Sequence, residues 1–169
     1  NSCLTEIGER AFQLCQNLQR MNAFPAELLR LRANAFIECC SLPGELVIPS
    51  KVVLVDLQCF RGCYAITGVV FHDNPTPAAD PVELGQYVFA ECRDLQSARL
   101  PQNTVLIPAH AFYYCPSLLN FSMPLFVAEI EEEAFSHCFA LQSVDLPERT
   151  IRIGDQAYEK CTSLVTVTI

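Results

Sequence analysis

The sequence contains no long uninterrupted apolar run, and its first residues lack the charged, then apolar, then small-residue order of a signal peptide. A membrane-spanning helix needs roughly 18 consecutive apolar residues, so we predict no membrane span. Because there is no targeting pattern, the sequence assigns no compartment. The chain opens with NSCLTEIGERAF, already inside a patterned segment, so we expect a mature product or a fragment of a longer chain.

Positive charge is also scarce in this sequence. Eleven Lys and Arg stand against 19 Asp and Glu, and the net charge of -8 argues against nucleic acids and anionic membrane surfaces as partners. A glycine-rich phosphate loop, an HExxH motif and a GxSxG motif are all missing. We therefore predict neither an enzyme nor a cofactor. With 51% hydrophobic residues, the 169-residue chain can bury a core as one domain spanning residues 1–169.

The sequence is dominated by an internal repeat. An aromatic residue recurs in seven copies at intervals of 24, 24, 29, 23, 23 and 23 residues, with a small or compact residue before it and a cysteine three positions after it. The aromatics are Phe12, Phe36, Phe60, Phe89, Phe112, Phe135 and Tyr158, and the cysteines are Cys15, Cys39, Cys63, Cys92, Cys115, Cys138 and Cys161. A period held through seven copies predicts stacked coils, with the aromatics as a spine that fills the interior.

Each copy contains two segments that favour extended backbone. LQSVDLP (141–147) and LVTVTI (164–169) alternate apolar and polar residues, as half-buried strands do, and a proline that ends strand pairing follows in five copies. A second aliphatic pair, as in VAEIEEEAF (127–135), leads into a short helix or 3₁₀ turn that carries the aromatic and the cysteine. One coil cannot bury its apolar side alone, so strands of successive coils must pair in parallel. We predict an α/β repeat solenoid, a right-handed coil with seven repeats of 23–24 residues.

This unit resembles the leucine-rich repeat of BspA-like bacterial surface proteins and their treponemal and protozoan relatives, whose typical segment is IGxxAFxxC. IGERAFQLC (7–15) and IGDQAYEKC (153–161) carry that segment most fully, and the resemblance covers nearly the whole chain. It implies a curved, non-catalytic solenoid that binds proteins or host surfaces at an extracellular or cell-surface location. An intracellular location stays open, because we expect most of the cysteines to lack a disulfide partner.

Several positions depart from the repeat. Copies one and two carry one extra residue, which predicts a small bulge around residues 19–24 and 43–48. Copy three is longer by six residues, and the excess falls in HDNPTPAADP (72–81), which predicts a projecting loop. That loop is either a tolerated surface insertion or a binding loop. In the middle copies the glycine of IG is replaced, which indicates that the turn there tolerates a side chain. The replacing residues are Arg32, Asp56, Pro108 and Glu131.

The ten cysteines admit several interpretations. Seven occupy the repeat slot and Cys59 occupies the alanine slot, so we predict that these eight pack as small buried hydrophobes in a reduced ladder. The alternative is a disulfide framework, with a bridge from Cys3 or Cys40 left open. A zinc site is disfavoured because the 24-residue interval between Cys39 and Cys63 is simply the repeat period. A nucleophilic cysteine is disfavoured because no arrangement of a histidine beside a cysteine recurs through the copies. The zinc site would use Cys39, Cys40, Cys59 and Cys63 with His72 or His137.

The candidate binding surface is the outward side of the first strand in each copy. These side chains are mostly small and polar with few charges, which suits a protein or glycan partner better than catalysis. With the start of the 72–81 loop, the candidates are Arg20, Asn22, Gly68, Val70, Ser97, Arg99, Asn120, Ser122, Ser143, Asp145, Thr166, Thr168, His72, Asp73 and Asn74. We predict a rigid binding or adhesion module for a host protein, a matrix protein or a glycan. The alternative is a structural spacer or an assembly subunit, indicated by TSLVTVTI, which ends in mid-strand.

Overall fold

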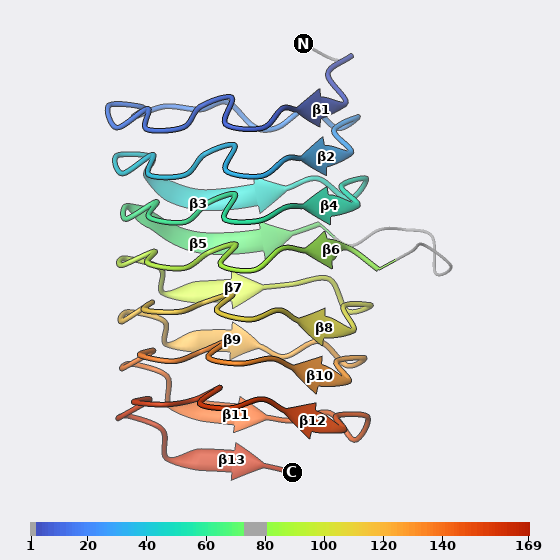
Figure 1. The fold of residues 1–169 in the computed structure, drawn as a ribbon, viewed down its shortest axis with the longest axis vertical. Helices are drawn as coiled ribbons and strands as arrows, with labels where there is room; N and C mark the ends of the chain where they lie inside the picture. The colour runs from blue at the N-terminus through green and yellow to red at the C-terminus, as the bar shows by residue number, and fades with distance from the viewer. Residues whose placement is uncertain (1–2, 73–80) are drawn as a thin grey trace.

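The computed structural model describes residues 3–72 and 81–169, which form a parallel-strand β-solenoid of about seven turns (Figure 1). Each coil runs through two extended segments joined by turns, as the alternation and the prolines predict. The longer strands form one ladder, called here the long ladder: β3 (Gly44–Ile48), β5 (Ile66–Phe71), β7 (Ser97–Arg99), β9 (Asn120–Ser122), β11 (Ser143–Asp145) and β13 (Thr166–Thr168). The two-residue strands form the short ladder: β1 (Glu6–Ile7), β2 (Arg30–Leu31), β4 (Leu54–Val55), β6 (Glu83–Leu84), β8 (Leu106–Ile107), β10 (Glu129–Ile130) and β12 (Arg152–Ile153).

All strand pairs are parallel, and each strand pairs with the equivalent strand of a neighbouring coil. The long ladder has the order β3-β5-β7-β9 followed by a separate pair, β11-β13. The short ladder is likewise divided into β1-β2-β4-β6 and β8-β10-β12. Both ladders therefore run along the solenoid, and each is interrupted once among the described residues.

The predicted helix at each aromatic is wrong, because the described residues form no helix there or elsewhere. Around Phe36, for example, Asn34 and Glu38 have φ of 58° and 56°, whereas an α-helix needs φ near -63° at every residue. The Phe36 N–H donates instead to the carbonyl of Cys59 in the next coil, at 2.8 Å. Consecutive turns bonded to the neighbouring coil thus replace the helix, and the fold is a β-solenoid rather than an α/β protein.

This turn conformation is the same in every copy. The residues two before and two after the aromatic all have positive φ: Arg10, Leu14, Asn34, Glu38, Gln58, Gly62, Tyr87, Glu91, His110, Tyr114, Glu133, His137, Gln156 and Lys160. Thirteen of these fourteen are not glycine, although a left-handed conformation costs about 1 kcal/mol for such residues. The hydrogen bonds and packing between coils therefore override local preference at these positions.

The predicted aromatic spine is confirmed. From Phe12 to Tyr158 the seven rings stack in sequence with centroids 4.9 to 5.7 Å apart. The five rings from Phe36 to Phe135 are fully buried, whereas Phe12 is 41% exposed. Close offset stacking of this kind adds to the free energy gained by burying the rings.

The predicted irregularities have different outcomes. The β3–β5 register shifts between Gly44 and Glu45, which pair with Ile66 and Gly68, so an irregularity lies within 43–48 as predicted. The residue left without a partner is Thr67 of β5, however, so the bulged strand is that of copy three and not that of copy two. Residues 19–24 form no strand at all, so the bulged strand predicted there is wrong. Of the predicted 72–81 loop, His72 is exposed at the end of β5, while Asp73 and Asn74 lie outside the described residues.

Glycine is needed at some copies of the IG position and not at others. A Cβ placed on Gly85 would lie 2.2 Å from the backbone nitrogen of Leu57 in the preceding coil, and one on Gly154 would lie 2.6 Å from the carbonyl carbon of Glu131. A Cβ on Gly8 would meet nothing within 4 Å. The substituted copies predict that this turn tolerates a side chain, but Gly85 and Gly154 leave no room for one because consecutive coils approach closely there.

Candidate functional site

The outward face of the long ladder carries two rows of aligned residues. In the first row Gly68 is paired with Ser97 and then Asn120, and in the second Val70 is paired with Arg99 and then Ser122. Beyond the interruption, Ser143 is paired with Thr166 and Asp145 with Thr168. Neighbouring strands lie about 4.8 Å apart, so each row presents side chains at a fixed spacing.

The structure does not place every predicted residue on these rows. Arg20 and Asn22 are exposed but lie in an irregular stretch beside the ladder. Glu45 and Val47 of β3, which sequence reasoning missed, extend the two rows by one coil, because Glu45 pairs with Gly68 and Val47 with Val70. The extra residue in copy two shifts the alignment of the copies and so concealed Glu45 and Val47. The apolar residues Leu46 and Ile48 could have revealed them, because in a strand the residues that alternate with inward apolar ones face outward.

Side chains on this face are short and closely spaced. A Cβ on Gly68 would lie 3.3 Å from Cγ of Glu45 and 3.5 Å from Oγ of Ser97, so Glu45 and Ser97 flank the glycine closely. Farther along, the Thr168 hydroxyl donates to Oδ1 of Asp145 at 2.8 Å. The face is therefore a preformed surface of small polar groups with few charges.

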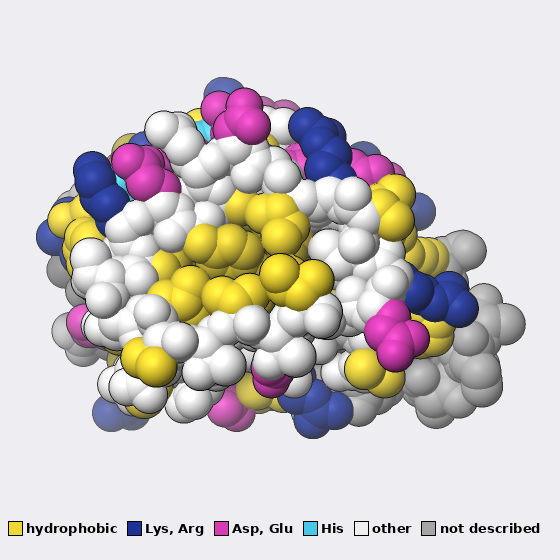
Figure 2. Space-filling view, turned by 90° about the horizontal axis from the view of Figure 1, so that it is seen from below, with side chains coloured by type: hydrophobic (Ala, Val, Ile, Leu, Met, Phe, Trp, Pro, Cys, Tyr) yellow, Lys and Arg dark blue, Asp and Glu magenta, His cyan; other side chains and the backbone are white. Residues whose placement is uncertain are grey.

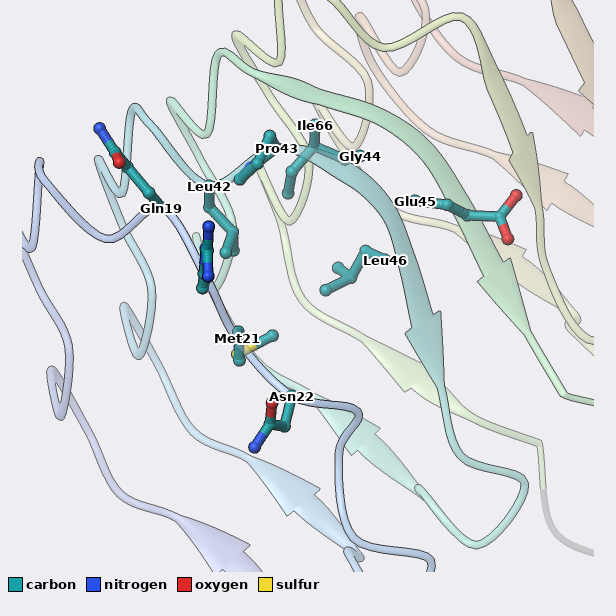
Figure 3. Close-up of a pocket in the computed structure, with 10 residues that line it drawn as sticks. Gln19, Met21, Asn22, Leu42, Pro43, Gly44, Glu45, Leu46 and Ile66 are labelled. Carbon is teal, nitrogen blue, oxygen red and sulfur yellow. The ribbon is translucent and has the colours of Figure 1, made fainter.

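A cavity of about 360 Å³ lies where coil one meets the long ladder. Residues 19–22 form one wall, and residues 42–46 with Ile66 form the other. In Figure 3, Met21, Leu42 and Leu46 surround the same space, while the carboxylate of Glu45 points away from it. Arg20 and Asn22 thus belong to this cavity rather than to the strand rows.

Aromatic and histidine side chains gather on the turns, at positions that sequence reasoning did not propose as a surface. We call this the turn-face cluster: Tyr87, His110, Tyr113, Tyr114, His137 and Phe139. Tyr87 and His110 stack with ring centroids 4.2 Å apart, and the Arg61 guanidinium lies 5.7 Å from the Tyr87 ring centroid. Comparing the residues flanking each aromatic across copies could have found the cluster, because tyrosine and histidine concentrate there only in copies four to six.

Polar contacts hold the two histidines of the turn-face cluster. The His137 Nδ1 lies 2.8 Å from Oγ of Ser136, and its Nε2 lies 3.2 Å from Nζ of Lys160. The His110 Nε2 lies 3.7 Å from a Glu133 carboxylate oxygen, and its buried Nδ1 makes no hydrogen bond. The two imidazoles are therefore built into the turns of neighbouring coils.

Six of the eight cysteines predicted to pack in the interior are buried, whereas Cys15 in the first coil is exposed and Cys161 in the last is only partly buried. Each slot thiol after the first donates to the carbonyl of the aromatic in the preceding coil; Cys39 reaches Phe12 at 3.1 Å and Cys115 reaches Phe89 at 3.1 Å. The other four bonds are Cys63 to Phe36, Cys92 to Phe60, Cys138 to Phe112 and Cys161 to Phe135. None of the nine cysteines from Cys15 onward is in a disulfide, so this structure contains neither the disulfide framework nor a bridge from Cys40.

Burial suppresses the chemistry of these thiols. It raises the pKa of Cys39 to about 11 and that of Cys92 to about 12, and it raises the pKa of Cys115 well above its ordinary value. A cysteine nucleophile or metal ligand acts as the thiolate, so these groups are neutral donors at physiological pH. Among residues 3–72 and 81–169, no three Cys, His, Asp or Glu side chains are grouped to hold a metal ion.

A comparison with protein-family models matches six copies of the BspA type leucine rich repeat region to residues 1–78 and 82–169. The chain belongs to the BspA-type leucine-rich repeat family. Leucine-rich repeats of this kind are generally protein-interaction modules and are typically not enzymes. A search of curated proteins finds no match.

Two solved structures resemble this BspA-type solenoid. A leucine rich cell surface protein from Faecalibacterium prausnitzii A2-165 aligns over 99% of this chain and 52% of its own, with a TM-score of 0.71 and 22% identity. The T. pallidum leucine rich repeat protein aligns over 89% of this chain and 68% of its own, with a TM-score of 0.68 and 25% identity. The BspA-type chain described here thus spans about half the length of the F. prausnitzii protein. No helix among its described residues is long and apolar enough to cross a membrane.

Proposed function

We propose that this chain is a binding module that recognises a protein, or a glycan carried by one, through the outward face of the long ladder. The observation that carries the proposal is the pair of aligned rows from Glu45 and Val47 across β5, β7 and β9, continued on β11 and β13. A surface fixed by parallel pairing needs little ordering on association, and a preformed surface loses less conformational entropy.

The same surface and the family support a protein or glycan partner and a cell-surface location. A mostly small, polar face with an arginine and a few carboxylates suits a protein surface or a glycan, such as a host or matrix component, and it lacks the positive charge that nucleic acid needs. The family generally serves interaction, and one structural neighbour is described as a cell surface protein. We propose a cell-surface adhesion role on this basis.

Replacing Arg99 and Asp145 with alanine is expected to weaken partner binding about tenfold, equivalent to about 1.4 kcal/mol. Both side chains are exposed on the long ladder, so the fold should remain intact. The measurement is the affinity for a partner first captured with the intact domain and identified by mass spectrometry. The matched control replaces Glu129 and Arg152, an exposed acid–arginine pair on the short ladder, with alanine. Equal losses in the two double variants would contradict the proposal.

One observation favours a second candidate function, that of an assembly subunit or spacer in a larger structure. Seen along the solenoid axis, the last coil presents a central group of hydrophobic side chains surrounded by backbone and other side chains (Figure 2). The exposed apolar residues of this coil include Ile153 at 46% and Val167 at 49%. An apolar end of this kind can be covered by a further coil of the same array, which would make the coils a spacer, or by a second copy, which would make them an assembly subunit.

If this end mediates assembly, the sedimentation coefficient should rise with protein concentration, and the Ile153→Lys, Val167→Lys double variant should sediment as a monomer throughout. Lysine in the patch would have to be desolvated on association, which is costly. A matched variant, Leu125→Lys, changes an exposed leucine on the turn before the short ladder and should not alter association. A concentration-independent sedimentation coefficient for the wild type would contradict the assembly function.

A further inference from the structure

The long ladder begins at β3, although coil one precedes it. Residues 18–25 lie beside β3 but form no strand, and among the described residues no backbone hydrogen bond joins this segment to β3. Equivalent segments elsewhere are bonded, as where the Leu119 N–H donates to the Gln96 carbonyl at 3.0 Å. β3 is therefore an edge strand inside the solenoid, with coil one separated from its edge.

The backbone groups that lack a strand partner on β3 can be identified from the direction of pairing. The Ile48 carbonyl accepts from the His72 N–H at 2.9 Å, so Ile48 directs its backbone groups toward β5. Successive residues of a strand direct theirs to opposite edges, so Glu45 and Val47 present N–H and C=O groups toward coil one. A row of such groups is a template for another extended chain.

The cavity described above lies along this edge. Its volume of about 360 Å³ is within the range of about 300 to 1,000 Å³ that is typical of ligand sites. Met21, Leu42 and Leu46 supply the apolar part of its surface, and polar groups, among them those of Gln19, Arg20 and Asn22, make up the larger part (Figure 3). The edge thus combines main-chain pairing groups with space for side chains.

The interruption of the long ladder between β9 and β11 shows that a missing strand pair need not leave such a cavity. Between β9 and β11 the inward residue is Phe121, whose ring packs edge-on against Phe112 and Phe135 at centroid distances of 5.2 and 4.7 Å. With Met123 it fills the gap, and a space of only about 10 Å³ remains. Coil one carries Met21 at the equivalent inward position, and there the space stays open.

We propose that the edge of β3 and the adjoining cavity bind an extended peptide, which adds to the long ladder as a strand between coil one and coil two. Its main chain pairs with Glu45 and Val47, and alternate side chains enter the cavity against Met21, Leu42 and Leu46. The partner is therefore a linear segment with aliphatic residues at every second position. β3 has five residues, or about 16 Å of strand, so about five peptide residues would pair. This mode leaves the outward face untouched and does not depend on the function proposed for it.

The probe is a blocked, fluorescein-labelled peptide with the sequence SLVTVTI, which this chain uses at residues 163–169 to form a strand of the same ladder. Its binding to the intact protein is followed by fluorescence anisotropy. The Val47→Pro variant should bind at least tenfold more weakly, because proline removes an edge N–H while the bonds to β5 remain. The matched Val47→Thr variant should bind as the wild type does. Unchanged binding to Val47→Pro, or no binding to the wild type at millimolar protein, would overturn the proposal.

Two N-methylated peptides keep the test decisive even if Val47→Pro destabilises the fold. One is methylated on the first, third, fifth and seventh amides and the other on the second, fourth and sixth, so each loses the donors of one strand edge. Pairing to β3 predicts that one peptide loses binding and the other keeps it. Equal affinities for the two peptides would show that main-chain pairing is not the mode of recognition and would overturn the proposal. The Arg99→Ala, Asp145→Ala variant should bind the peptide normally, which separates this site from the outward face.

Discussion

Raising the pH from 8 to about 10.5 is expected to unfold this protein in the presence of a reductant. Six cysteines, Cys39, Cys59, Cys63, Cys92, Cys115 and Cys138, are fully buried, and burial raises the pKa of each above the ordinary value of 9.0. Below pH 9 these thiols are protonated in both the folded and the unfolded chain, so their contribution to the free energy of unfolding does not change with pH. Above pH 9 the unfolded chain releases these protons and the folded chain retains them, so stability falls until the folded pKa is reached.

The effect is comparable in size with the whole stability of a typical domain. Each thiol lowers the free energy of unfolding by about 1.4 kcal/mol per pH unit within this window. Six together lower it by roughly 8 kcal/mol per pH unit, against a typical total of about 5 to 15 kcal/mol. For Cys39 and Cys92 the window extends from 9.0 to pKa values of about 11 and 12.

Urea unfolding at pH 8.0, 9.3 and 10.0 measures this dependence. The Cys115→Ala variant should have a slope above pH 9 that is shallower by about 1.4 kcal/mol per pH unit. Cys15→Ala is the matched control, because Cys15 occupies the same slot in coil one but is exposed. A free energy of unfolding that stays level between pH 8 and 10 would show that the slot thiols do not govern stability.

Gly85→Ala is expected to destabilise the fold by about 3 kcal/mol, because the added methyl would lie 2.2 Å from the backbone nitrogen of Leu57. A backbone atom cannot rotate away as a side chain can, so coils three and four must separate locally. That separation would strain the paired residues of β4 and β6 on either side of the contact. The measurement is the urea midpoint together with the thermal midpoint, which should fall by roughly 6 to 12 °C.

Gly8→Ala is the control within the same repeat slot, because a methyl there would meet nothing within 4 Å. This variant should change the free energy of unfolding by less than about 0.5 kcal/mol. If both variants lost equal stability, the cause would be the intrinsic conformation of the IG turn rather than the approach of neighbouring coils.

Much of this fold could be predicted from the sequence because the determining information is periodic. The seven aromatics and their cysteines indicated the stacking, the spine and the reduced thiols. The helix could not be predicted correctly, because residues such as Glu38 and His137 take left-handed φ values that their type does not favour. Those values are imposed by hydrogen bonds to the next coil, and such bonds are invisible in any single copy.

The candidate surfaces were predictable to a smaller extent. Alternation placed Ser97 and Asp145 on the outward face, whereas the added residue in copy two hid Glu45 and Val47. The extra residue in copy one likewise indicates a bulge in a strand, which would place Arg20 on a strand, whereas residues 19–24 form none. The cavity beside β3 arises from a strand pair that fails to form, and the sequence of coil one gives no signal of that failure.

The hydrogen bonds between coils give the solenoid a direction. In each turn the backbone N–H groups at and around the aromatic donate toward the next coil, as Phe36 does to Cys59, while the thiol donates back toward the preceding one, as Cys63 does to Phe36. The two ends of any stretch of coils are therefore chemically different, like the plus and minus ends of a filament. Further coils, or a second copy, can continue these turn bonds only head to tail, because a two-fold related copy would face N–H donors with donors at one end and carbonyl acceptors with acceptors at the other.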